Sequence, residues 1–129
     1  SERALLAGED RRQASARLQP VMRPPELQAA QALVQQVHAS DPLLDYLQAL
    51  IAATRSGQWF VDGLSPRAGI AVLRVSKARA LMAGRDYVAP DDVQAILPQA
   101  IGHRLVPLPA SGRGPIEQVR AMVEAIPIP

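Results

Sequence analysis

Most residue types that enzymes use for nucleophilic and metal chemistry are scarce in this chain of 129 residues. It has no cysteine and two histidines, His38 and His103, which lie far apart along the sequence. A catalytic zinc site needs three protein ligands, and a nucleophilic triad needs an oriented base. Ser40 and Asp41 follow His38 closely, but they precede a proline and are better suited to start a helix. We therefore expect no catalytic residues in this chain.

The acidic residues do not predict a metal site either. Asp91 and Asp92 follow Pro90 at a predicted helix start, where two acids usually interact favourably with the helix dipole. A calcium loop requires alternating acids and a glycine over about twelve residues, and the sequence has no such stretch.

Nucleotide hydrolysis by a P-loop is excluded for this chain alone. A P-loop is a glycine-rich turn that follows a strand and ends in Lys-Ser/Thr. Lys77 is the single lysine, and it stands inside the longest predicted helix. No apolar strand ends in Asp-Glu to hold magnesium. The isolated chain is therefore expected to be inactive as an ATPase.

One arginine nevertheless has the surroundings of a phosphate-binding residue. Arg67 follows Ser65-Pro66 in the expected first turn of the longest helix, where backbone N–H groups lack partners. The helix dipole disfavours a cation there unless an anion is near, and the guanidinium fork suits phosphate. Arg74 shares this face and would either line the same cleft or be solvated. From the residues alone, two interpretations of Arg67 remain open: it is part of an anion-binding site, or it is a solvated surface arginine.

The elements that must position Arg67 are helices. Alanine and leucine dominate, whereas aromatic residues make up only 3% of the chain, and this composition favours helices over strands. Apolar residues recur at spacings of three and four, and Pro, Ser, Asp and Gly mark the boundaries. The predicted helices cover about residues 26–38, 41–55, 65–83, 90–102 and 115–125, with a partly helical segment over 2–18. The pattern predicts an all-α fold, a small bundle of five to six helices.

The helix over residues 65–83 is predicted to be central, because it is apolar on two sides. One face consists of Ile70, Leu73, Ala80 and Leu81. The second face consists of Ala68, Ala71, Val72, Val75 and Met82.

The connecting segments are assigned structural roles. Trp59 and Phe60 are expected to pack their loop onto the bundle. Arg85 follows Gly84 and is expected to bond the final carbonyls of the preceding helix. His103 and Arg104 follow another helix end. Their main expected role is capping and packing, and the alternative is a contact with another subunit.

Charge and hydropathy limit the possible partners. The net charge of +2 is too small to indicate a nucleic-acid-binding protein. No apolar run approaches the ~18 residues of a membrane-spanning helix. The lack of cysteine is typical of a reducing compartment, so a cytoplasmic location is expected.

Several motifs, in order, carry a resemblance to a known family. The main ones are Gly63-Leu64-Ser65-Pro66-Arg67-Ala68, residues 84–93 and His103-Arg104-Leu105. Residues 3–8, 41–46, 53–55 and 126–129 fit the same pattern. In this order and spacing, nearly the whole chain resembles the C-terminal lid domain of MoxR-type AAA+ ATPases.

The resemblance implies a single lid domain over residues 1–129, with a hinge-proximal segment at 1–20 and a C-terminal loop and short helix at 107–129. Such a lid closes over Mg-ATP that is held by a core domain absent from this chain. Arg67 matches the sensor-2 arginine, which reaches the phosphates and couples their state to lid rotation, while Ser65 and Pro66 support the helix start. The parent protein would be an ATPase.

The resemblance also implies partners. MoxR-type proteins form rings, typically hexamers, and act as chaperone-like ATPases, often with von Willebrand factor A-domain proteins. The alternative from the residues alone is a stand-alone helical module that binds protein or nucleic acid. One residue departs from the family, because Ala89 stands where Thr or Ser often caps the next helix.

Overall fold

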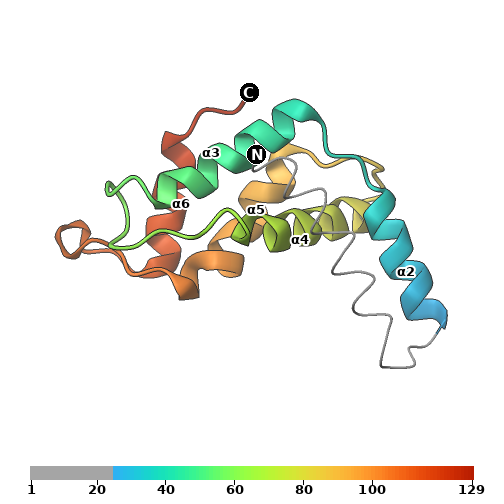
Figure 1. Ribbon diagram of the computed structural model, residues 1–129, viewed down its shortest axis with the longest axis horizontal. Helices are drawn as coiled ribbons and strands as arrows, with labels where there is room; N and C mark the ends of the chain where they lie inside the picture. The colour runs from blue at the N-terminus through green and yellow to red at the C-terminus, as the bar shows by residue number, and fades with distance from the viewer. Residues whose placement is uncertain (1–24) are drawn as a thin grey trace.

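The computed structural model describes residues 25–129, and this part of the chain is helical (Figure 1). Its α-helices are α2 (Pro25–Gln36), α3 (Asp41–Thr54), α4 (Ala68–Met82), α5 (Pro90–Ile101) and α6 (Pro115–Ala125). Two short 3-10 helices, η1 (Gly102–Arg104) and η2 (Pro109–Ser111), connect α5 to α6. The all-α prediction is confirmed, and each of these five helices was expected. The helix predicted over residues 2–18 lies outside the described residues.

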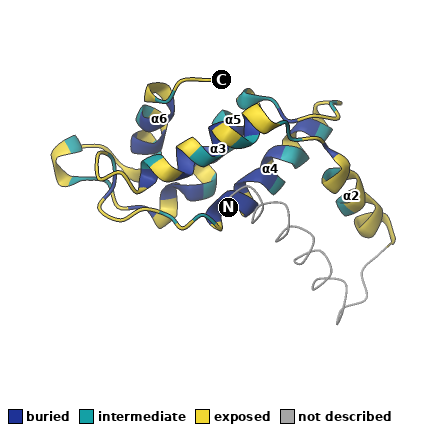
Figure 2. Ribbon diagram, turned by 45° about the horizontal axis from the view of Figure 1, so that its top comes forward, coloured by how far each residue is buried: buried dark blue, intermediate teal, exposed yellow. Residues whose placement is uncertain are grey.

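The core forms where α3, α4, α5 and α6 meet, with α4 and α5 sharing the most extensive contact. Figure 2 shows the buried sides of these helices turned toward one another. The apolar side of α3 is largely buried. Only Leu44 is partly exposed among its apolar residues at helical spacing, which are Leu43, Leu44, Tyr46, Leu47, Leu50 and Ile51. The fully enclosed side chains include Leu47, Leu50, Leu97, Val119 and Met122.

The second apolar face predicted for α4 is only partly covered, which corrects the sequence analysis. Ala68 and Val72 are buried, but Ala71 and Val75 are exposed and Met82 is 88% exposed. The helix does contact α2, α3 and α5. Of these three neighbours, α2 lies at the end of the bundle where α4 ends (Figure 1), and none of the residues of α2 is buried. The apolar face of α4 is therefore wider than the surface that its neighbours cover.

Specific backbone motifs set the helix ends. The Ser40 hydroxyl accepts a hydrogen bond from Leu43 N at 3.2 Å, as expected for a capping serine before Pro42. Gly84 (φ +80°) ends α4, with Gly84 N bonded to Leu81 O and Arg85 N to Ala80 O, both at 2.9 Å. This pair of bonds is a Schellman motif, in which a residue without Cβ adopts the left-handed conformation.

The start of α5 lacks a side-chain cap, and this predicts a stabilising substitution. Ala89 has an extended backbone (φ −97°, ψ 157°), and its methyl side chain cannot accept from the N–H groups of the first turn. Ala89→Thr is expected to raise the free energy of unfolding by about 1 kcal/mol, because the hydroxyl would accept one of these N–H groups. Thermal unfolding of both proteins tests this. A matched Ala89→Val change adds similar volume without an acceptor, and an equal gain in Val would contradict the capping explanation.

Candidate functional site

Arg67 lies at the N-terminal end of α4, but the helix begins later than expected. It starts at Ala68, so Arg67 is the N-cap residue rather than a first-turn residue, and its backbone is helical (φ −64°, ψ −25°). Ser65 and Pro66 form a tight turn instead of the first helical residues. The hydrogen bonds show this turn: Ala68 N donates to Ser65 O at 3.0 Å and Gly69 N donates to Pro66 O at 3.1 Å. Both bonds span three residues, as in a 3-10 turn, rather than the four of an α-helix.

The same bonds correct a second expectation. The sequence analysis assumed that the first N–H groups of this helix have no partners. In the structure Ala68 N, Gly69 N and Ile70 N all donate to carbonyls of the turn, the last to Arg67 O at 3.0 Å. An anion here would therefore interact with the guanidinium and the helix dipole rather than with unpaired amides.

The segment that enters this turn is bound to the end of α3. Leu64 N donates to Thr54 Oγ1 at 3.0 Å, and Arg55 Nη1 donates to Leu64 O at 2.8 Å. Thr54 is fully buried, and its hydroxyl donates to Ile51 O at 2.6 Å. Both backbone polar groups of Leu64 are thus held by two consecutive residues of α3 and its cap. These contacts were not predicted, because they join two segments that are about ten residues apart and do not belong to one helix.

Gly63 lies directly against the backbone of Arg55. A Cβ built at residue 63 would be 2.5 Å from Arg55 Cα and 2.6 Å from Arg55 N, and it would also overlap Arg55 Cγ. Backbone atoms cannot rotate away from such an overlap as a flexible side chain can. The glycine therefore permits a close approach that any larger residue would prevent.

The loop before Gly63 packs onto the bundle, as expected for Trp59 and Phe60, and it is hydrogen-bonded to α6 and to the segment before it. Phe60 is buried, and Trp59 packs against the core. Val61 N donates to Val106 O at 2.9 Å, and Leu108 N donates to Trp59 O at 3.1 Å. The buried side chain of Gln118 on α6 also donates to Trp59 O, at 2.8 Å.

The other predicted site residues have less distinctive positions. Ser65 and Arg67 are exposed, while Pro66 and Arg74 are half-buried. Arg74 lies two turns into α4 on the side of Arg67.

No group of three or more His, Cys, Asp or Glu within residues 25–129 has metal-binding geometry. His103 and Arg104 are exposed in η1.

A cluster of charged residues centres on the buried Asp92. Its side chain is fully buried and pairs with Arg79 Nη1 at 2.8 Å and with both terminal nitrogens of Arg85 at 2.7 Å. It also accepts from Ala89 N at 2.8 Å. The hydrogen bonds from Arg85 are the main cause that lowers the pKa of Asp92 from 3.8 to about 2, against the opposing effect of burial.

This cluster changes the roles assigned to Asp92 and Arg85. Asp92 was expected to interact with the helix dipole, a role that fits the exposed Asp91 better. The Arg85 side chain was expected to bond the last carbonyls of α4, but its backbone N–H fills that role while the guanidinium binds Asp92. The ion pair between Arg79 and Asp92 could not be predicted from residue spacing, because Arg79 lies on α4 and Asp92 on α5.

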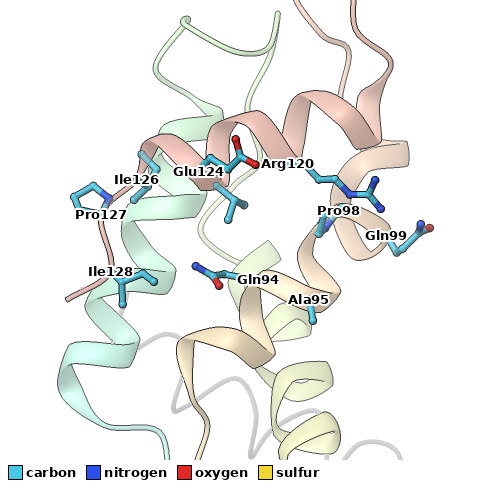
Figure 3. A pocket seen from close by; sticks show the side chains of 10 residues that line it. Gln94, Ala95, Pro98, Gln99, Arg120, Glu124, Ile126, Pro127 and Ile128 are labelled. Atoms are coloured by element: carbon cyan, nitrogen blue, oxygen red, sulfur yellow. The ribbon is translucent and has the colours of Figure 1, made fainter.

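A groove lies between α5, α6 and the C-terminal segment (Figure 3). Pro98 and Val123 contribute apolar surface, and Arg120 and Glu124 on α6 give the lining one charge of each sign. None of the residues around Arg67 lines this groove. Within the described residues, no helix is long and apolar enough to cross a membrane.

Comparisons with known proteins agree with this geometry. Residues 52–126 match the sequence family described as "AAA lid domain". Protein YeaC of Bacillus subtilis is 33% identical over 115 residues, which cover 87% of this chain and 36% of YeaC. Chaperone MoxR1 of Mycobacterium tuberculosis is 37% identical over 73 residues, covering 50% of the chain and 19% of MoxR1.

Two further proteins are similar. Protein MoxR of Methylorubrum extorquens is 35% identical over 71 residues, covering 52% of the chain and 21% of that protein. The crystal structure of a putative ATPase from Cytophaga hutchinsonii superposes with a TM-score of 0.68 and 26% identity, over 76% of this chain and 33% of that one. The chain thus spans only 19% to 36% of the length of these three curated relatives.

Proposed function

Because this chain belongs to the AAA lid domain family, as a lid of the MoxR type, we propose that it closes over ATP bound to a nucleotide-binding core in a longer polypeptide. In this proposal Arg67 is the sensor-2 residue, and Ser65 and Pro66 form the turn that presents it. The chain contributes to an ATPase without carrying the residues that hydrolyse ATP. Its family membership favours this role over a stand-alone interaction module.

The observation that carries the proposal is the exposed Arg67 at the N-terminus of the longest described helix, in a turn bound to α3. A guanidinium is always charged and offers a planar set of donors that fits phosphate oxygens. Held in a fixed direction, it stabilises the negative charge that develops on the phosphoryl group during transfer. The described residues offer no second set of phosphate ligands of the P-loop type, so the core must hold magnesium and the remaining phosphate oxygens.

Loss of the terminal phosphate would remove the anion that Arg67 contacts, and the lid would then be free to rotate. Residues 1–20, which lie outside the described part of the chain, are proposed as the hinge-proximal segment, and Arg74 as a residue that lines the same cleft. The proposal extends to the complete protein, which would assemble as a hexameric ring like other members of the family. It would have chaperone-like activity in the cytoplasm. Von Willebrand factor A-domain proteins are the proposed partners.

Substitution of Arg67 in the full-length protein tests this proposal. Arg67→Ala is expected to lower ATP turnover at saturating ATP by about tenfold or more, because it removes a charge that acts on the transferring phosphate. Steady-state hydrolysis measures the effect, and Arg67→Lys should retain part of the activity. Arg120→Ala removes another exposed arginine, on α6, and should leave turnover unchanged. Normal turnover in a folded Arg67→Ala protein would refute the sensor role.

A further inference from the structure

The backbone segment that leads into Arg67 is held by contacts made outside α4. Leu64 lies ten positions after Thr54, and the connection between them includes Gly57, which has a positive φ of 81°. A glycine-containing connection of this kind has many conformations when unfolded, and fixing each of its residues costs conformational entropy. Some interaction must therefore hold the end of the loop before it enters α4.

Thr54 and Arg55 provide this interaction from two sides of one peptide segment. The Thr54 hydroxyl is oriented by its 2.6 Å bond to Ile51 O, so its oxygen lone pairs are available to the N–H of Leu64. Arg55 binds the carbonyl of the same residue, two positions before Pro66. A residue held at both its donor and its acceptor cannot rotate about its backbone without breaking a hydrogen bond.

The close packing of Gly63 on Arg55 adds a steric limit to these two bonds. The backbone of residue 63 approaches Arg55 so closely that even a methyl group would not fit. From Leu64 the path to Arg67 is short, and the turn is closed by the bonds of Ala68, Gly69 and Ile70. The end of α3 is thus connected to Arg67 by consecutive restrained residues.

We infer that Thr54 and Arg55 are positioning residues that aim Arg67 at the nucleotide phosphates. This inference rests on the proposed sensor role of Arg67 and adds the residues that make it effective. A preorganised cation acts on the transferring phosphate without first being ordered, whereas a loosely held one must be ordered in each turnover. Arg55 therefore affects turnover only through Arg67.

A double-mutant cycle in the full-length ATPase tests this dependence. Arg55→Met removes the donor to Leu64 O but keeps the aliphatic stem beside Gly63. It is expected to lower kcat about three- to tenfold with Arg67 present and to have no further effect in the Arg67→Ala protein. Arg55→Lys restores one donor and should recover part of kcat. Thermal unfolding verifies that each variant folds, and Arg55→Gln replaces Arg55→Met in the cycle if that protein does not fold.

The outcomes separate this inference from the proposed function. If Arg67→Ala lowers turnover but the Arg55 variants do not, the sensor role stands and the positioning role is refuted. If an Arg55 variant lowers kcat by the same factor with and without Arg67, its effect is a general structural one, which also refutes positioning. If Arg67→Ala changes nothing, the proposed function fails, and the positioning role fails with it.

Discussion

Replacement of Asp92 with alanine is expected to lower the free energy of unfolding by about 3 kcal/mol, because it removes the buried partner of two arginines. Arg85 is only 25% exposed and would keep its charge in a poorly solvated position. Arg79 is 44% exposed and can return to water, so the expected loss lies at the lower end for a buried pair. The N–H of Ala89 would also lose its acceptor.

Urea or thermal unfolding measures this loss, and the adjacent acid provides the control. Asp91→Ala removes a carboxylate from the same helix turn, but Asp91 is exposed, so the change should stay below about 1 kcal/mol. Asp92→Asn retains an acceptor for Ala89 N and should cost less than Asp92→Ala. Equal stabilities of the Asp91 and Asp92 alanine variants would contradict the assigned ion-pair cluster.

The pH dependence gives a second test of the same residue. The pKa of Asp92 is depressed to about 2 from 3.8, so the folded protein binds this proton less tightly than the unfolded chain. The stabilisation is therefore complete above about pH 4 and is lost as the pH falls toward 2. The shift corresponds to about 2 kcal/mol. Asp92→Asn should lack this acid-dependent component, which is measured as the difference between the two proteins at each pH.

Gly63→Ala is expected to destabilise the chain by about 3 kcal/mol. The added methyl group would overlap the backbone of Arg55, with 2.5 Å to its Cα, and the two chain segments must separate to accept it. Separation also weakens the bonds that Thr54 and Arg55 make to Leu64. The substitution therefore combines steric overlap with the loss of hydrogen bonds.

Chemical denaturation of Gly63→Ala and of a matched glycine variant measures this effect. Gly114 has a negative φ of −73°, and a Cβ there would have no heavy atom within 4 Å. Gly114→Ala should therefore cost at most about 1 kcal/mol, because glycine is preferred over alanine at an N-cap. Similar losses in both variants would show that general chain stiffening, rather than the contact with Arg55, determines the result.

The elements of this fold were predictable from local patterns. Apolar spacing and boundary residues placed five helices, and the structure agrees closely for α5 and α6. Ser40 before Pro42 was identified as a cap, because capping depends on residues that are adjacent in sequence. The start of α4 was less accurate, since Ser65, Pro66 and Arg67 form a tight turn that has nearly the same sequence signature as a first helical turn.

The extent of burial was less predictable than the helices themselves. The second apolar face of α4 was expected to be covered, but Val75 and Met82 are exposed. Periodicity identifies which side of a helix is apolar, whereas the length and position of its neighbours decide how much of that side is covered. The helix α2 lies at one end of the bundle and covers only part of the apolar side of α4.

The sequence by itself determined the helical class and the family resemblance, and it led to the proposal that Arg67 recognises phosphate. Only the tertiary structure decided that Thr54 and Arg55 hold Leu64, that Gly63 contacts Arg55, and that Arg79 and Arg85 share Asp92. Helix signals come from interactions within a few residues, which a linear sequence displays directly. These contacts join separate elements, and their geometry depends on how the whole bundle packs.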